Sequence, residues 1–319
     1  METQQPVETQ QPVVMENAAR VDFRSAVNHR SYSITVALPL IAVPEKGCPV
    51  LYVLDGNWYF GSAVEAVRVY APGAVVVGIG YPNDEPYIQR VLDRHEHIPA
   101  YIKDQPAFRT VPYLERFYDL SLPASDEVLA SDLDTSIQIR ASNVGGLDSF
   151  LEVIATEIKP RVAALVPIDS SRQALFGHSL GGLAVLHALF VAPNAFRTYI
   201  AASPSIWWNG KAVLGGESKF AAAVRAGTAT PRVLITMGGE EQTPDPNYAV
   251  RFGLDLQQQA AQTRRHRMVD NARELTERLK ALRGSGAFEV EDFSVFPKQH
   301  HNIAAWSALA RGVSFAFPR

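Results

Sequence analysis

The chain has 319 residues with a formal net charge of −3, and 47% of its residues are hydrophobic. A chain of this size and composition can form one large α/β domain, and its near-neutral charge speaks against nucleic acid as a partner. The single cysteine, Cys48, excludes an internal disulfide, and the Cys and His residues lack the spacing of a zinc site. No stretch has the apolar length of a membrane span or the pattern of a secretory signal, so we predict a cytoplasmic protein without a membrane partner.

The first residues form a short repeat. Residues 2–7 read Glu-Thr-Gln-Gln-Pro-Val, and residues 8–13 repeat the same six amino acids. Polar, low-complexity sequence of this kind cannot bury enough apolar surface to order itself. We therefore predict a disordered tail over residues 1–20 and a single folded domain over residues 21–319.

From about residue 31 onward, short apolar runs alternate with helical patterns. The runs that predict strands are 34–41, 50–54, 75–79, 173–176, 199–202, 233–237 and 288–296. Strands that alternate with helices favour a mainly parallel, doubly wound α/β sheet with helices on both faces. The last run alternates apolar and polar residues, which predicts a strand near the edge of that sheet.

Two segments interrupt this alternation. Residues 83–145 are rich in proline and charge and poor in periodicity, and residues 239–266 form a second polar stretch directly after a strand. Loops of this length in a compact domain are usually functional or disordered. We expect residues 83–145 to form an insertion or cap over the carboxyl edge of the sheet, where ligands bind in such folds.

The sequence Gly177-His178-Ser179-Leu180-Gly181 lies between a predicted strand and a predicted helix. A serine on such a sharp turn, flanked by glycines because the turn is crowded, is typical of a nucleophile elbow. The alternative is a glycine-bordered turn with a solvated serine. A nucleophilic serine needs a base to take its proton and an acid to orient that base, and these follow in the order serine, acid, histidine.

Candidates for both partners follow later strands. The predicted strand 233–237 is followed by Glu240 and Glu241, and the strand ending at residue 296 is followed by His300 and His301. Either member of each pair could reach Ser179, and each could instead be a solvated surface residue.

The tetrahedral intermediate also needs backbone donors for its oxyanion. We predict that the amide of Leu180 supplies one and the amide of Asn57, in the loop Asp55-Gly56-Asn57-Trp58, supplies the other. In this prediction Gly56 lets the backbone turn inward, and the alternative is a plain Asp-Gly turn.

Six motifs together resemble a known family. They are Leu-Asp-Gly-Asn at 54–57, Gly-Ile-Gly-Tyr-Pro at 78–82, Arg-Phe-Tyr-Asp-Leu at 116–120, Gly-Gly-Leu-Asp-Ser-Phe-Leu at 145–151, Phe-Gly-His-Ser-Leu-Gly-Gly at 176–182 and Ser-Pro-Ser-Ile-Trp-Trp-Asn at 203–209. They resemble the esterase branch of the α/β-hydrolases. That branch contains the ferri-siderophore esterases of enterobactin, salmochelin and bacillibactin and fungal esterases of triacetylfusarinine-type hydroxamates.

The resemblance implies which of the duplicated candidates acts. It points to Glu241 as the acid and to His301 as the base, leaving Glu240 and His300 as the alternates. The residues Lys298-Gln299-His300 depart from the family pattern, which often has a glycine and an acidic residue there.

Four further side chains are candidate substrate contacts. The resemblance places Trp207 and Trp208 beside the active site, where an indole could contact a flat ligand ring. Trp58 and Arg116 are the other two. The alternative for the tryptophans is packing under a loop.

Charge bears on the substrate class. A ferric tris-catecholate is an anion and needs a basic pocket. Residues 83–123 contain seven acidic side chains beside five basic ones, Arg90, Arg94, Lys103, Arg109 and Arg116. This balance favours a neutral complex such as a ferric tris-hydroxamate. The cluster Arg264-Arg265-His266-Arg267 could reach the pocket rim or form a solvated helix end.

We therefore predict a serine carboxylic-ester hydrolase that forms an acyl-enzyme and hydrolyses the ester bonds of a siderophore. It needs no cofactor, and iron enters only as part of the small-molecule substrate. The alternatives are a general carboxylesterase or feruloyl-type esterase, an acyltransferase with the same three residues, and a binding protein without catalysis.

Overall fold

The structure is a computed structural model that describes residues 14–95, 98, 105–133, 139–246, 249, 255–282 and 288–318. The repeated hexapeptides of residues 2–13 and the predicted basic residue Lys103 lie outside the described residues.

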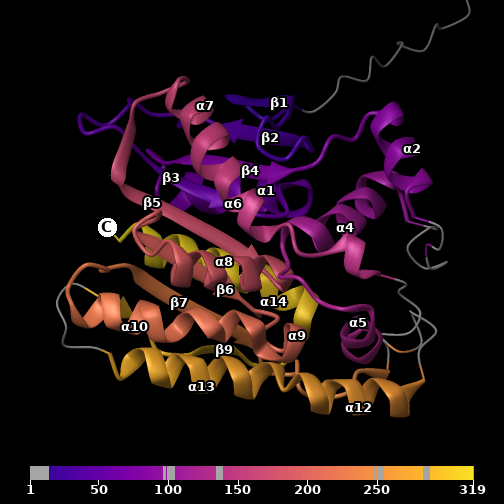
Figure 1. The fold of residues 1–319 in the computed structure, drawn as a ribbon. Coiled ribbons are helices and arrows are strands. Elements are labelled where there is room, and N and C mark those ends of the chain that lie inside the picture. The colour runs from indigo at the N-terminus through magenta and orange to yellow at the C-terminus, as the bar shows by residue number, and fades with distance from the viewer. Residues whose placement is uncertain are drawn as a thin grey trace, which may run out of the picture.

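Nine strands of the described chain form one sheet in the order β1-β2-β4-β3-β5-β6-β7-β8, and β9 also pairs with β7 (Figure 1). Their bounds are β1 Ala18–Arg24, β2 Ser31–Ala37, β3 Cys48–Val53, β4 Val75–Gly80, β5 Ile168–His178, β6 Thr198–Ala202, β7 Arg232–Gly238, β8 Glu289–Val290 and β9 Ser294–Phe296. Strands β1 and β2 pair antiparallel, and β4, β3, β5, β6, β7, β8 and β9 run parallel. The predicted mainly parallel α/β sheet is confirmed.

Helices cover both faces of the sheet, as predicted. Helices α1 (Gly56–Tyr70) and α14 (His301–Ala316) lie on one face. On the other face lie α6 (Leu147–Val153), α7 (Lys159–Ala163), α8 (Leu180–Val191), α10 (Glu217–Arg225) and α13 (Met268–Lys280), which stand in front of the sheet in Figure 1. Buried side chains form one cluster on each face, and the successive β5 residues Leu175 and Phe176 belong to different clusters. This alternation is what a strand buried on both sides requires.

The N-terminal boundary of the domain differs from the prediction. Residues 18–20 belong to β1 and pair with β2, so the predicted tail of residues 1–20 ends too late. Most of β1 is exposed, and it has no apolar run by which the sequence could reveal it. It forms because β2 offers an unpaired edge.

The last predicted strand is broken into two short ones. Both β8 and β9 pair with β7, so the predicted position at the sheet edge is confirmed while the continuous run of residues 288–296 is not.

The insertion contains regular helices, which its weak periodicity did not predict. They are α2 (Glu85–Asp93), α4 (Ala107–Asp119) and α5 (Asp126–Asp132), followed by a 3-10 turn at Ala141–Asn143. Together with α12 (Leu256–His266) they lie at the end of the sheet to which β5 runs (Figure 1). Among the described residues, no helix combines the length and apolarity needed to cross a membrane.

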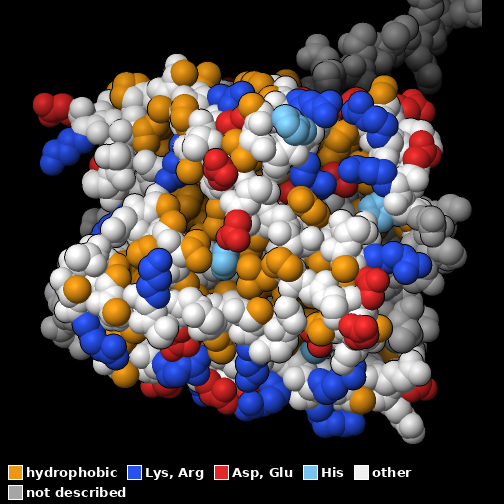
Figure 2. Space-filling view, viewed as in Figure 1, with side chains coloured by type: hydrophobic (Ala, Val, Ile, Leu, Met, Phe, Trp, Pro, Cys, Tyr) orange, Lys and Arg blue, Asp and Glu red, His pale blue; other side chains and the backbone are white. Residues whose placement is uncertain are grey.

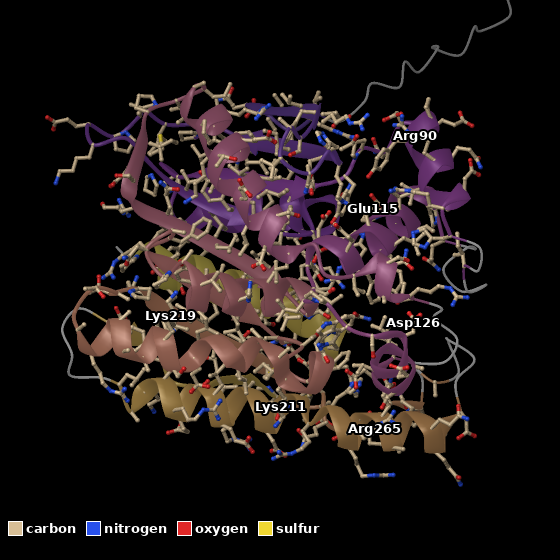
Figure 3. All side chains as sticks on the ribbon, viewed as in Figure 1. Arg90, Glu115, Asp126, Lys211, Lys219 and Arg265 are labelled. Carbon is tan, nitrogen blue, oxygen red and sulfur yellow. The ribbon has the colours of Figure 1, made fainter. Side chains whose placement is uncertain are left out.

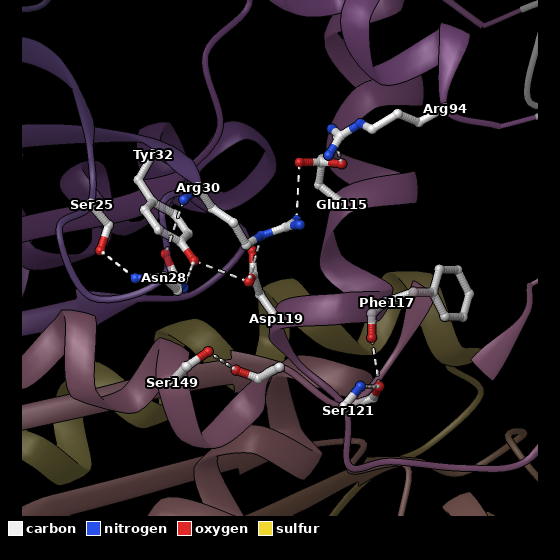
Figure 4. A network of polar contacts seen from close by, with 12 residues as sticks. Ser25, Asn28, Arg30, Tyr32, Arg94, Glu115, Phe117, Asp119, Ser121 and Ser149 are labelled. Carbon is white, nitrogen blue, oxygen red and sulfur yellow. Dashed lines mark hydrogen bonds and ion pairs between the residues drawn. The ribbon is translucent and has the colours of Figure 1, made fainter. Parts of the chain in front are cut away.

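A buried charged network fastens α4 to the N-terminal part of the sheet (Figure 4). Arg30 donates to Glu115 at 3.0 Å and lies 3.0 Å from Asp119, which also accepts a hydrogen bond from Tyr32. Burial, opposed in part by Arg30, raises the pKa of Asp119 to about 6. These contacts hold α4 firmly, and α4 in turn carries Arg116 beneath the candidate site.

Candidate functional site

Ser179 stands on the turn between β5 and α8, with φ 64 and ψ −118. Non-glycine residues rarely adopt a positive φ, and such strain persists only where the surroundings enforce it. Here the Ser179 amide donates to Ala202 at 3.0 Å, and the Ser179 carbonyl accepts from the Ser205 amide at 3.1 Å. The turn therefore holds the serine at the carboxyl edge of the sheet.

The glycines around Ser179 are needed because backbone atoms approach closely. A Cβ at Gly177 would lie 2.3 Å from the Gly181 carbonyl oxygen, and one at Gly182 would lie 2.7 Å from that of Ala202. The predicted crowding is confirmed at Gly177 and is weaker at Gly181, where a Cβ would lie 3.2 Å from Oδ2 of Asp55. Gly182 is a crowded position that the sequence did not predict.

His301 and Glu241 meet beside this turn. His301 is the first residue of α14, and its Nδ1 lies 2.5 Å from Oε2 of Glu241. The other carboxylate oxygen, Oε1, accepts hydrogen bonds from the Ser203 hydroxyl at 2.5 Å and the Gly238 amide at 2.6 Å. Both oxygens of a buried carboxylate are thus used, and the carboxylate cannot rotate without losing a partner.

The neighbouring candidates are not part of this pair. Nε2 of His300 lies 3.9 Å from Asp245, and among the described residues the Glu240 side chain forms no hydrogen bond with His301. The contact geometry therefore pairs His301 with Glu241, in agreement with the choice that the family resemblance implied.

His178 links the elbow to α14. Its Nε2 lies 2.9 Å from the His301 carbonyl oxygen, and the two imidazole rings lie 4.4 Å apart between centroids. Within the described residues the Ser179 hydroxyl itself makes no hydrogen bond. Contacts of this kind are often loose without substrate and tighten when it binds.

Two helix N-termini lie side by side at the predicted oxyanion site. Strands β3 and β5 are neighbours, and α1 and α8 follow them directly. The first bonded amides are those of Trp58 in α1 and Leu183 in α8, so the helices leave the amides of Asn57 and Leu180 unpaired. Unpaired amides at a helix N-terminus can stabilise an anion.

The reason why residue 56 must be glycine differs from the prediction. The inward turn is made by Asp55, with φ 53, and Gly56 is required because a Cβ would lie 2.5 Å from the Gly78 carbonyl carbon of β4. The Asn57 side chain bonds both the amide and the carbonyl of Tyr81, at 2.8 and 2.9 Å, and so anchors this loop to the chain after β4.

Arg116 is buried rather than open to a substrate, which corrects the prediction of a substrate contact. It is 6% exposed and donates to both oxygens of Asp55, at 2.9 and 3.0 Å, and to the His178 carbonyl at 3.2 Å. The sequence could not predict this burial. Arg116 lies in a charged segment, and its partner Asp55 is 61 residues away along the chain.

The tryptophans divide into two kinds. Trp208 is 1% exposed and donates to the Leu122 carbonyl at 2.9 Å, so it packs under the insertion and the predicted substrate contact is corrected. Trp58 and Trp207 are half-buried, and their indole N–H groups find no acceptor among the described residues. These two remain candidates for substrate contact.

The sequence placed His266 only within the basic cluster of residues 264–267, and the structure brings it against Trp207. Its ring stacks on Trp207, with centroids 3.8 Å apart, and its Nε2 donates to the Asp132 carbonyl of α5 at 2.8 Å. Burial lowers the pKa of His266 to about 4. Its neighbours Arg264 and Arg265 are exposed on α12, where Figure 3 labels Arg265. Only the histidine of this basic cluster turns inward.

Comparison with known proteins agrees with this architecture. Residues 121–293 match the model of the Esterase family, described as "Putative esterase". The chain is 31% identical to ferri-bacillibactin esterase BesA of Bacillus subtilis over 90% of this chain and 85% of that protein. It is 32% identical to a siderophore enterobactin esterase of Emericella nidulans over 89% of this chain and 88% of the relative.

The fold has close counterparts among solved structures. Siderophore hydrolase EstA from Aspergillus nidulans superposes with a TM-score of 0.72 at 28% identity, covering 98% of both chains. The chain therefore belongs to the Esterase family and is a serine esterase with the α/β-hydrolase fold.

Proposed function

We propose that this enzyme hydrolyses the ester bonds of a siderophore, with Ser179 as nucleophile, His301 as general base and Glu241 as the acid that orients it. The contact between His301 and Glu241 beside the elbow carries the proposal. It supplies the base and acid that a serine needs, in a chain whose relatives bear the names of siderophore esterases.

The proposed reaction has two steps. In the first, Ser179 Oγ attacks the ester carbonyl while His301 Nε2 takes its proton, the ester C–O bond breaks, and the alcohol leaves with that proton. In the second, His301 deprotonates water, which attacks the acyl-enzyme; the bond to Ser179 Oγ breaks, His301 returns the proton to Oγ, and the acid is released. Glu241 accepts the hydrogen bond from Nδ1–H, which fixes the tautomer with Nε2 free to act as the base.

We assign the oxyanion to the amides of Leu180 and Asn57. Each lies in the first turn of its helix and is left unpaired by it, and the two helices follow adjacent strands. Donors held by the backbone need no reorganisation as charge develops on the carbonyl oxygen, which is why such sites are effective.

The indole N–H groups of Trp58 and Trp207 are proposed donors to substrate oxygens. Each N–H is buried without an acceptor among the described residues. A buried donor without an acceptor costs free energy, which a hydrogen bond to a ligand would recover. The ring of Trp207 is held rigid by His266 on one face.

The substrate class that we propose is a neutral ferric complex, such as a tris-hydroxamate. Arg94 pairs with Glu115 and Arg116 pairs with Asp55. The exposed basic side chains of the described insertion also include Arg90 and Arg109, and they are balanced by the exposed acidic side chains of Asp84, Glu85 and Asp93. On the face seen in Figure 2, basic and acidic side chains are interspersed rather than segregated. An anionic tris-catecholate would favour a surface of one sign.

The test is a substrate panel followed by mass spectrometry. Ferric and iron-free forms of a hydroxamate ester siderophore and of a catecholate trilactone are compared with p-nitrophenyl acetate, using Ser179→Ala as the inactive control. We expect the fastest turnover with the ferric hydroxamate. Turnover of short aryl or acetyl esters alone would contradict the siderophore assignment and favour a general carboxylesterase.

We further propose that the enzyme acts in the cytoplasm. The free Cys48 thiol, which is buried, fits a reducing compartment. Cell fractionation with an antibody to the chain tests this, and recovery of the protein outside the cell would contradict it.

A further inference from the structure

We propose that His178 and Tyr59 are positioning residues that hold the base His301 at the correct position relative to Ser179. This inference rests on the proposed function. His178 directly precedes the serine of the elbow, and Tyr59 lies in the first turn of α1. Neither touches the reacting atoms in the mechanism above.

A chain of hydrogen bonds connects the two helices on one face of the sheet. The Tyr59 hydroxyl lies 3.1 Å from Nδ1 of His178, and Nε2 of His178 lies 2.9 Å from the His301 carbonyl oxygen. A carbonyl can only accept, so Nε2 must carry the proton. In the neutral ring Nδ1 is then an acceptor, and Tyr59 must donate to it.

The surroundings keep this arrangement in one protonation state. Tyr59 is 6% exposed and His178 3% exposed. Burial, with nearby Asp55, raises the pKa of Tyr59, so its hydroxyl remains a donor. Burial, together with His301 and Arg116, lowers the pKa of His178 well below its ordinary value, so the ring stays neutral. His178 therefore adds no positive charge beside His301 when His301 takes the proton of Ser179.

The hydrogen bond between His178 and the His301 carbonyl is placed where it can fix the position of the base. His301 is the first residue of α14 and follows a loop in which Lys298 has φ 57. The side chain of His301 is held at one end by Glu241, and His178 fixes its backbone from the other side. Because His178 is covalently attached to Ser179, the same residue sets the positions of nucleophile and base relative to each other. Misplacing a catalytic group by about 1 Å can cost on the order of 100-fold in rate.

Variants of His178 test this with p-nitrophenyl acetate as the probe substrate. His178→Leu removes the donor to His301, and we expect a fall in kcat on the order of 100-fold with KM unchanged. His178→Gln places an amide N–H near the position of Nε2, and we expect it to restore a large part of that loss. Tyr59→Phe keeps the ring volume and the His301 bond, so a smaller fall in kcat is expected.

The matched control is His187→Leu, which removes a hydrogen-bonded histidine of α8 whose partner is the exposed Asp148. It should retain the kcat of the parent. If His178→Leu folds and keeps the parental kcat, or if His178→Gln folds and is as slow as His178→Leu, the proposal is overturned. Should His178→Leu fail to fold, a parental kcat in Tyr59→Phe overturns it.

The same experiment separates this inference from the proposed function. A parent enzyme that neither hydrolyses p-nitrophenyl acetate nor reacts with a fluorophosphonate at Ser179 overturns the proposed function itself. An active parent whose folded His178 and Tyr59 variants all keep its kcat overturns only the positioning role.

Discussion

The carboxylate of Glu241 lies 2.5 Å from Nδ1 of His301 through one oxygen and is held by Ser203 and Gly238 through the other. Because the two carboxylate oxygens have different partners, replacing Glu241 by glutamine has a predictable effect. In Glu241→Gln the carbonyl oxygen can still accept from Ser203 and Gly238, and the NH2 group must then face His301. An N–H donor there favours the tautomer with the proton on Nε2, which cannot act as a base.

Glu241→Gln should therefore lower kcat by about 10³- to 10⁴-fold while the protein remains folded. The matched control is Glu240→Gln, whose side chain forms no hydrogen bond or ion pair with His301, and it should keep the parental rate. Steady-state kinetics on one ester measures both. Equal losses in the two variants would contradict the assignment of the acid.

Arg116 should contribute to stability rather than to substrate binding. Arg116→Met leaves Asp55 buried without its partner, and breaking such a pair costs about 3–5 kcal/mol in the free energy of unfolding. Arg94→Met removes the half-exposed partner of Glu115 and should cost about 1 kcal/mol or less. Urea unfolding compares them. A stable Arg116→Met enzyme with a raised KM would instead restore the predicted substrate contact.

Substitutions of the two adjacent tryptophans should affect different properties, stability for Trp208 and substrate binding for Trp207. Trp208→Ala removes a fully buried indole and should lower the free energy of unfolding by about 3–5 kcal/mol. Trp207→Ala should lose a donor to substrate, which raises KM for the siderophore about three- to ten-fold, as expected for one neutral hydrogen bond. Thermal unfolding and Michaelis–Menten analysis of both variants check this. An unchanged KM in Trp207→Ala contradicts its proposed role.

The stability of the enzyme should depend on pH through His266. Its pKa is about 4 in the folded protein, because of burial, and about 6.5 when unfolded, so the unfolded chain binds more protons between these values. The contribution of this group is present above about pH 6.5 and is lost as the pH falls towards 4, up to about 3 kcal/mol. Other buried histidines act in the same direction, so the difference between parent and variant is the informative quantity.

His266→Gln should show a weaker fall in unfolding free energy between pH 7 and pH 5 than the parent does. The measurement is urea unfolding at both values. Parallel losses in parent and variant would mean that His266 keeps an ordinary pKa.

The parts of this protein that sequence patterns predicted are those specified by local rules. The elbow is visible because steric crowding demands glycine at residue 177, and the central strands are visible because burial on both faces makes them apolar throughout. Local sequence patterns do not predict strand β1 or helix α4. The first is an exposed edge strand, and the buried face of the second includes Arg116 and Asp119, whose partners are distant in the chain.

The same distinction applies within the site. Single-sequence patterns left both histidines and both glutamates open, and the contact between His301 and Glu241 discriminates between them only in three dimensions. His178 and His301 are 123 residues apart, so no spacing along the chain could reveal their hydrogen bond. Long-range pairing of polar groups is the information that local patterns lack.

The central claim is that Ser179 is a nucleophile activated by His301, and labelling with a fluorophosphonate followed by peptide mass spectrometry tests it most directly. We predict one adduct, on Ser179, that forms rapidly in the parent, slowly in His301→Ala and not at all in Ser179→Ala, with the fold of all three intact. Ester hydrolysis by a folded Ser179→Ala enzyme, or an adduct on another residue that abolishes activity, would contradict the claim.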